Sequence, residues 1–244
     1  LIDGRLYRSD HVIPEGPVDL SVGKFSANSS LGSRNFVLKP GFDEREAAAL
    51  PTLLGAEQKA WLLSSLEASG ATWKILGSDV QLSQMVIDLR SFELLPEQFR
   101  NLFYFSCDQW DGYRSERAEL LRTIGGLDNV VAIAGDIHAF YASELYADFD
   151  DQSVPPVAVE FVCAGISSSP VQEITQSTVD SSPTLSALGL GALVPQFDTI
   201  LQQASPQYRY AKSLTHGIAI MDVQGAAAVE VEYLQIADVR TPEW

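Results

Sequence analysis

The stretch NVVAIAGDIHAFYASEL, residues 129–145, decides the fold that we expect. A run of small and apolar residues stops at Gly135, and an acid and a histidine follow, one residue apart, as Asp136 and His138. A short apolar run that ends at a turn signal is typical of a buried strand. In open α/β sheets, functional groups collect at the carboxyl ends of strands. The stretch therefore predicts a buried strand that ends in two polar side chains, which an extended backbone would direct to the same side.

Helical and strand patterns alternate on both sides of this stretch. Amphipathic helical patterns that close at glycines lie at residues 55–70 and 113–126. Apolar strand patterns lie at 72–78, 101–107, 130–135 and 157–165. Residues 216–236 predict a hairpin with one solvated face, because valine and tyrosine alternate there with glutamate around a turn at Gly225. This order predicts an α/β fold with mixed β-sheets sandwiched by helices.

The remaining segments carry weaker patterns. Residues 1–50 are rich in breakers and predict an irregular lead-in or several short strands, whereas 51–244 carry the regular patterns. Residues 170–215 are rich in serine, threonine, proline and glycine. We expect them either to cover the site or to form an ordinary surface segment. Since no linker or internal repeat interrupts the chain, we expect residues 1–244 to form a single unit.

Composition excludes several classes of protein. Of the 244 residues, 46% are hydrophobic and 20% are charged, as in an ordinary globular protein, and the net charge of −16 leaves no basic stripe for nucleic acid. No apolar run approaches the length of a bilayer span, and no signal-peptide pattern is present. Because the chain begins at Leu1, we interpret it as a mature, trimmed or cut product. Cys107 and Cys163 lie in apolar runs, which favours two small buried hydrophobes over a disulfide.

Carboxylates at the ends of two predicted strands are the candidates for chemistry. Asp136 and His138 offer an oxygen and a nitrogen that suit a di- or trivalent cation. Asp108 or Asp111, delivered by the neighbouring strand, is the expected third contributor. A structural alternative exists for each: a helix N-cap with a hydrogen-bonded histidine for the first pair, and an Asx-turn with an N-cap for the second.

Other polar residues are expected to be structural. His11 and His216 are isolated in the sequence, and Glu160 is an acid inside an apolar run, either at a sheet edge or paired. No G-x-S-x-G, GxGxxG, P-loop or HExxH motif occurs, which removes the commonest serine hydrolase, dinucleotide and zinc-protease readings.

Four motifs in a fixed order resemble a known family. TLLGAEQKAWLLSSLEASGATWKILGSDVQL, DQWDGYRSERAELL, VVAIAGDIHAFYASEL and VAVEFVCAGISSS resemble the second half of the PhoD-like alkaline phosphatases and phosphodiesterases, from about Thr52 to the closing hairpin. The first fifty residues match only loosely. This family belongs to the calcineurin-like metallophosphoesterases, so the resemblance implies half of a four-layer sandwich, with mixed sheets between helices.

The resemblance also implies a reaction and roles for residues. It implies metal-dependent hydrolysis of phosphate mono- or diesters, with Fe³⁺ and Ca²⁺ as the expected ions and a secreted or periplasmic location. Asp136 and His138 stand where the family's Gly-His-x-His pair stands, so with Asp108 they are the expected metal ligands. Asp111 is the expected catalytic residue, and Arg117 is expected to bind the substrate.

One departure from the family pattern changes what we expect of this chain alone. The ligand motifs of the family's first half, which contain Asp, Cys, Asn and His, are absent, and DGRLYRSDHV does not have their spacing. We therefore expect a C-terminal half that is inactive by itself, with a companion N-terminal chain or segment that is either separate or truncated away. The alternative is a non-catalytic half-domain that acts as a structural or binding module.

Overall fold

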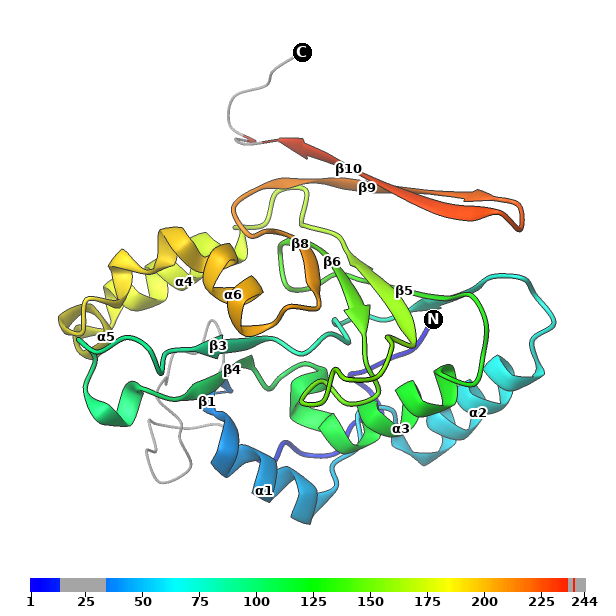
Figure 1. Cartoon of the computed structure of the whole chain (residues 1–244), viewed down its shortest axis with the longest axis horizontal. Helices are drawn as coiled ribbons and strands as arrows, with labels where there is room; N and C mark the ends of the chain where they lie inside the picture. The colour runs from blue at the N-terminus through cyan, green and yellow to red at the C-terminus, as the bar shows by residue number, and fades with distance from the viewer. Residues whose placement is uncertain (14–33, 237–238, 240–244) are drawn as a thin grey trace.

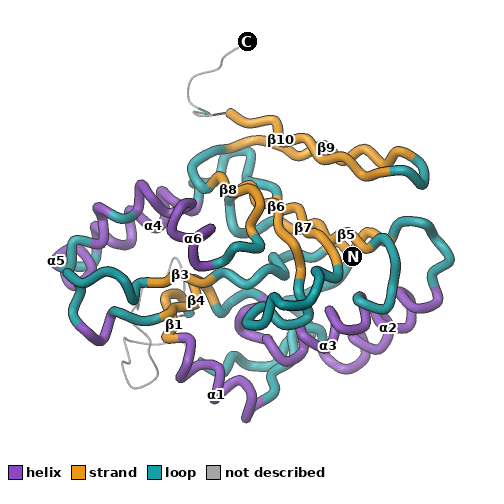
Figure 2. Tube along the Cα trace, viewed as in Figure 1, coloured by secondary structure: helices purple, strands orange, loops and turns teal. Residues whose placement is uncertain are grey.

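The computed structural model describes residues 1–13, 34–236 and 239 (Figure 1). Its helices are α1 (Lys39–Ala49), α2 (Gly55–Ala68), α3 (Arg114–Ile124), α4 (Val171–Ser181), α5 (Pro183–Ala187) and α6 (Phe197–Ala204). Its strands are β1 (Asn35–Leu38), β2 (Lys74–Gly77), β3 (Val86–Asp88), β4 (Leu102–Ser106), β5 (Val130–Ala134), β6 (Phe140–Leu145), β7 (Ala158–Val162), β8 (Tyr208–Lys212), β9 (His216–Gln224) and β10 (Ala228–Ile236). Figure 2 shows helices and strands intermixed along the chain, so the predicted α/β class is confirmed.

The largest sheet has five strands in the order β2-β5-β7-β6-β8. β2, β5 and β7 run parallel, whereas β6 and β8 are antiparallel to their neighbours, so the sheet is mixed as predicted. α2 and α3 cover one face, where Leu62 and Leu121 join Leu76 in a buried apolar cluster. Because Gly77 of β2 pairs with Ile133 of β5, the segments after these two strands leave the sheet at one edge.

A second sheet has three strands in the order β1-β4-β3. α1 packs on one side of it, where Phe42 contacts the edge of the Tyr104 ring. α4 to α6 pack on the other side, where Phe197 contacts Phe105. These helices and β3–β4 enclose an almost wholly apolar pocket of about 690 Å³, open mouth included. The helical part of residues 170–215, α4 to α6, thus forms an apolar layer over this sheet, whereas β8 joins the five-stranded sheet.

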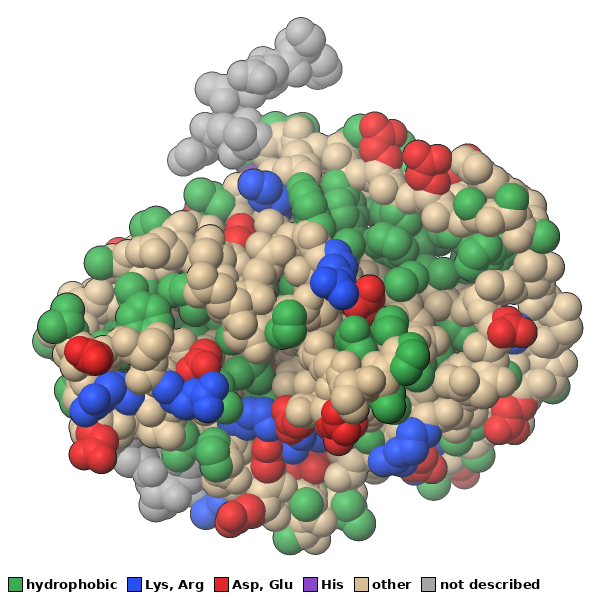
Figure 3. Space-filling model, in the orientation of Figure 1, with side chains coloured by type: hydrophobic (Ala, Val, Ile, Leu, Met, Phe, Trp, Pro, Cys, Tyr) green, Lys and Arg blue, Asp and Glu red, His purple; other side chains and the backbone are tan. Residues whose placement is uncertain are grey.

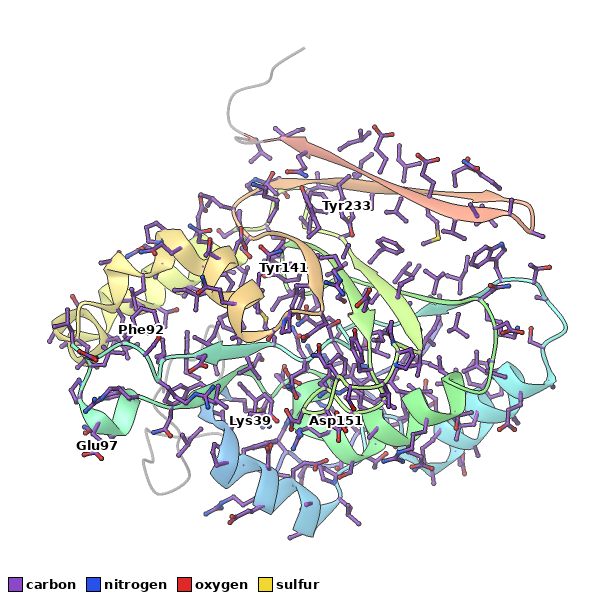
Figure 4. All side chains as sticks on the ribbon, viewed as in Figure 1. Lys39, Phe92, Glu97, Tyr141, Asp151 and Tyr233 are labelled. Atoms are coloured by element: carbon purple, nitrogen blue, oxygen red, sulfur yellow. The ribbon has the colours of Figure 1, made fainter. Side chains whose placement is uncertain are left out.

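The β9–β10 hairpin lies across the other face of the five-stranded sheet. The Tyr233 ring lies 4.7 Å from that of Phe140, and its hydroxyl donates to the Tyr141 carbonyl at 2.6 Å (Figure 4). At the other end, Trp73 Nε1 donates to the Gly225 carbonyl at the hairpin tip, at 2.8 Å. The hairpin is therefore fastened near both of its ends and spans the sheet between them.

The sheet face under the hairpin stays partly open. Ile75 of β2 and Val159 of β7 are 45% and 37% exposed there. Figure 3 shows apolar side chains gathered below the hairpin and acidic side chains on its upper side. The predicted hairpin is confirmed, with its acidic residues Glu230 and Glu232 exposed.

The described part of the lead-in is more regular than expected. Residues 35–49 form β1 and α1, and residues 1–13 have no regular secondary structure, while 14–33 lie outside the described residues. β6 and β8 were also not predicted. Cys107 is buried, Cys163 is half-buried, and both are free thiols. Among the described residues, no helix combines the length and apolarity that crossing a membrane requires.

Candidate functional site

The turn after β5 carries two of the predicted site residues. β5 ends at Ala134, and the chain then bends instead of continuing as a strand. Asp136 and His138 have positive φ angles of 68° and 60°. Asp and His enter this left-handed region more readily than most residues. Ile137, between them, is buried in the apolar cluster. The expected extended backbone is therefore wrong, yet both polar side chains still lie outside the core, with Asp136 45% exposed.

The His138 ring is held by a backbone acceptor. Its Nδ1 lies 2.8 Å from the Ser169 carbonyl oxygen. A carbonyl only accepts, so in the neutral ring Nδ1 carries the hydrogen and Nε2 carries a lone pair. The Val171 N–H donates to the His138 carbonyl at 3.1 Å, which ties the start of α4 to the same turn. His138 is therefore hydrogen-bonded, as the structural alternative expected, but only through Nδ1. Its Nε2 remains available to bind a ligand.

Asp108 lies at the centre of a cluster of basic side chains. It follows β4, which belongs to the three-stranded sheet, whereas β5 belongs to the five-stranded sheet. The expectation that Asp108 follows a strand next to β5 is therefore wrong. Its carboxylate lies 2.9 Å from His11 Nε2 and 3.2, 3.2 and 3.5 Å from Nη1 of Arg5, Arg8 and Arg34. Burial raises the pKa of Asp108, but the His11 contact and the arginine charges outweigh it and lower the pKa to about 2. Asp108 is therefore ionised at any physiological pH.

Arg5 joins Asp108 to the turn after β5. Its Nη2 lies 3.8 Å from Asp136 Oδ1, while its Nη1 contacts Asp108. Burial raises the pKa of Asp136, Arg5 and His138 lower it, and the negative charges of Asp108 and Asp79 raise it further. Arg5 thus bridges the carboxylates of Asp108 and Asp136, and His138 lies two residues after Asp136 on the same turn. The structure thus brings the three predicted ligands to one edge of the protein.

Asp111 and Arg117 form a buried ion pair. Arg117 Nη1 lies 2.7 Å from Asp111 Oδ1, and each side chain is only 3% exposed. Asp111 also accepts from the Met85 N–H at 2.8 Å, and Arg117 donates to the Leu82 carbonyl at 3.0 Å. Both residues therefore hold the loop before β3. Their predicted roles in catalysis and substrate binding stay predictions.

The donors at this edge fit part of a metal site. Asp136 accepts no hydrogen bond within the described residues, and the oriented His138 ring matches the way that metal-binding histidines are held by a second acceptor. Asp108, by contrast, already faces four basic groups. In residues 1–13, 34–236 and 239, no group of three His, Cys, Asp or Glu side chains is placed to hold an ion. Asp136 and His138 thus fit as two ligands of an incomplete set.

Several site residues were missed by sequence reasoning. Arg5 and Arg8 lie about a hundred positions from Asp108, and His11, expected to be isolated, contacts it. Nothing local in the sequence signals these contacts. Asp79 follows β2 as Asp136 follows β5, and it accepts the Gly4 N–H at 3.0 Å. The rule about carboxyl ends of strands, applied once more, would have found it.

Comparison with known proteins agrees with this architecture. The sequence model of the PhoD-like phosphatases matches residues 1–233. Alkaline phosphatase D of Bacillus subtilis (strain 168) is 34% identical over 119 residues, which are 48% of this chain and 19% of that protein. A solved structure of PhoD shares the fold, with a TM-score of 0.58 and 21% identity over 95% of this chain and 38% of that one. The chain thus spans well under half of each relative. Because the family model covers nearly its whole length, the chain belongs to the PhoD-like phosphatase family.

Proposed function

We propose that this chain is part of a metal-dependent hydrolase of phosphate mono- or diesters and supplies the C-terminal part of its active site. Family membership supports a hydrolase of phosphoesters. Metal dependence and a role in the active site are supported by one observation. Asp136, the Nε2 atom of His138 and the Arg5–Asp108 ion pair lie at the same edge of the protein. An available carboxylate, an available imidazole nitrogen and a guanidinium at one place suit a cation and a phosphate together.

Asp136 and His138 would hold a metal ion, and Asp108 would join them if its basic neighbours shift. Metal ions bound there would neutralise the phosphate charge and generate an oxygen nucleophile at moderate pH. The carboxylates favour hard cations, so Fe³⁺ and Ca²⁺ remain the proposed ions. The chain's own part is to fix the His138 ring through the Ser169 carbonyl and to keep Asp136 outside the core by burying Ile137.

Asp111 and Arg117 would support this site from the protein interior, by holding the loop before β3. The Asp111 carboxylate binds the N–H of Met85, and the Arg117 guanidinium binds the carbonyl of Leu82. Glu160, the acid in the apolar run, accepts the N–H groups of Leu82 and Ser83 at 2.6 and 2.9 Å. These three buried groups fix the loop that also carries Asp79. We propose that Asp111 and Arg117 act on catalysis through this loop.

A companion N-terminal chain or segment would complete the ligand set. The described residues hold no group of three ligands, and the solved PhoD structure is matched over only 38% of its length. We therefore propose that the chain is inactive alone. We also propose that the complete enzyme is secreted or periplasmic, because the chain resembles the PhoD-like family. A non-catalytic half-domain is the competing proposal.

The test joins metal content to turnover. The chain is produced together with the segment that supplies the missing family motifs, and bound metal and hydrolysis of an aryl phosphate are measured. The variant His138→Ala should lose metal and activity together, whereas Asp151→Ala, at an exposed loop carboxylate, should retain both. Normal turnover by His138→Ala would refute its role as a ligand. A metal-free, inactive complex would favour the half-domain.

A further inference from the structure

The outward face of the β9–β10 hairpin is apolar near its base and acidic toward its tip. Because the Tyr233 ring points toward Phe140 of the five-stranded sheet, the residues next to Tyr233 in β10 point away from that sheet (Figure 4). Residues directly opposite each other share a face, so their partners in β9 point outward as well. Near the base, this face carries four aliphatic side chains that are 41–52% exposed: Ile218, Ile220, Leu234 and Ile236. Toward the tip it carries three exposed acids: Asp222, Glu230 and Glu232.

The four aliphatic side chains, which we call the outer patch, are neighbours on the hairpin surface. Ile218 lies directly opposite Leu234, and Ile220 and Ile236 each lie two residues further along one of the two strands. Long strand pairs seldom leave such side chains in water, because a gathered apolar face binds other proteins or other β-structure. A two-stranded hairpin is also only marginally stable until one of its faces is covered. The outer patch therefore has the character of a contact surface.

The acids on this face allow a second copy of the hairpin to dock in one direction only. In an antiparallel arrangement centred on the Ile218–Leu234 pair, the acidic end of each hairpin lies over the base of the other. Since a strand rises about 3.4 Å per residue, Asp222 lies about 14 Å from this centre, and the two acidic ends lie about 27 Å apart. That separation exceeds the Debye length of about 8 Å at physiological salt, so their repulsion is screened although the chain has a net charge of −16. A parallel arrangement would place acid against acid.

The base of the hairpin offers a positive charge to the incoming acidic end. Lys212 is exposed and lies opposite Phe140 in the β6–β8 pair, and Phe140 contacts Tyr233 beneath the base. The surface thus combines an apolar centre, acids at one end and a cation at the other end. Such a surface is complementary to itself when two copies meet across a two-fold axis.

From this arrangement we infer that the outer patch is the contact surface of a symmetric homodimer, in which two β9–β10 hairpins pack face to face and antiparallel. Two strands of nine residues offer a face about 30 Å long and about 10 Å wide, or roughly 300 Å². Stable dimers bury about 800 Å² on each partner, so this dimer is weak, with a Kd on the order of 10–100 µM. The inference uses neither the proposed metal ligands nor the proposed reaction.

The test measures self-association of the whole chain by sedimentation equilibrium, at concentrations from about a tenth of this Kd to about ten times it. Wild type should show a reversible monomer–dimer equilibrium. Leu234→Glu should raise the Kd at least about tenfold, because it places a charge at the apolar centre of the contact. Leu94→Glu is the matched control, since Leu94 is fully exposed in the loop between β3 and β4 and the variant has the same net charge. It should change the Kd less than about twofold, because screened surface charges act weakly.

Two further arms keep the test decisive. Thermal unfolding checks that Leu234→Glu is folded, and the milder Ile218→Thr replaces it if it is not. A bismaleimide that spans about 10 Å, the spacing of packed sheets, tests the orientation in a Cys163→Ala background, where the remaining Cys107 is buried. Ile218→Cys, at the two-fold axis, should cross-link the two copies, whereas Gln224→Cys, near the tip, should not.

Three results would overturn the inference: a wild-type chain that stays monomeric, equal weakening by Leu94→Glu, or faster cross-linking through Gln224→Cys. A chain that stays monomeric but binds the companion segment through the outer patch would assign this surface to that segment instead. Because neither metal nor turnover is measured, failure of the proposed hydrolase would leave the dimer measurements unchanged.

Discussion

Replacing Arg117 by methionine should destabilise the protein in a strongly pH-dependent way. The variant Arg117→Met keeps most of the side-chain volume against Phe149, whose ring lies 4.7 Å from the guanidinium carbon. It removes the partner of Asp111, which is 2% exposed as a residue, and leaves the Leu82 carbonyl without its donor. Breaking a buried ion pair from one side costs about 3–5 kcal/mol because the other charge is stranded.

The magnitude has a ceiling, because the stranded Asp111 can take up a proton. An ordinary aspartate with a pKa of about 3.9 costs about 4 kcal/mol to protonate at pH 7 and about 1.5 kcal/mol at pH 5. In the variant, the folded-state pKa of Asp111 is raised above its unfolded value. The variant is therefore most stable, relative to wild type, at low pH, and it loses that stability as the pH rises. We expect a loss of about 4 kcal/mol in the free energy of unfolding at pH 7 and about 1.5 kcal/mol at pH 5.

Urea unfolding at both pH values measures these free energies. The double variant Asp111→Asn/Arg117→Met keeps an acceptor for the Met85 N–H and removes the stranded charge. It should be more stable at pH 7 than Arg117→Met alone, with a coupling of about 1–3 kcal/mol between the two positions. A loss below about 1 kcal/mol, or one that is the same at pH 5 and pH 7, would refute the reasoning. If instead Arg117 touches substrate, KM would rise while stability stayed unchanged.

Two further predictions concern Asp108 and the hairpin. Because the pKa of Asp108 is lowered to about 2, the ionised carboxylate stabilises the fold above about pH 4. This contribution is less than about 2.5 kcal/mol, since solvent screens the 30% exposed side chain, and it is lost as the pH falls toward 2. The difference in Tm between wild type and Asp108→Asn should therefore shrink from pH 5 to pH 2, and a constant difference would contradict the assignment. Trp73→Phe removes the hydrogen bond to the Gly225 carbonyl and should speed amide exchange at the tip of the β9–β10 hairpin, with a global loss below about 1 kcal/mol. Unchanged exchange at the tip would show that this bond does not hold it.

Local patterns allowed most of the central elements to be predicted from the sequence. The predicted apolar runs correspond to β4, β5 and β7, and the amphipathic patterns correspond to α2 and α3. These patterns are informative because a strand buried on both faces is apolar throughout, whereas a helix buried on one face is apolar every three or four residues. α1 was missed because Pro40 and Gly41 resemble a break, although proline fits the first turn of a helix. β6 was missed because it follows the site turn directly, with no breaker between Ala139 and Phe140.

The candidate site was predictable only where it is local in sequence. Asp136 and His138 follow one strand, so the rule about strand ends found them, although the left-handed turn that presents them was not foreseen. Arg5 reaches Asp108 across 103 positions, and only the tertiary fold brings them together. For Asp111, residue type alone could not show that its carboxylate is buried, because its burial and its ion pair depend on where the fold places Arg117.

The buried Ile137 has a practical consequence for anyone who redesigns this protein. Its side chain belongs to the interior, while the residues on either side of it, Asp136 and His138, carry the oxygen and nitrogen atoms of the proposed metal site. Any change that tightens or loosens the interior near this isoleucine will also re-aim both of its neighbours. Core packing and the proposed metal site are thus linked through one aliphatic side chain, and libraries that repack the core should be screened for stability and metal binding together.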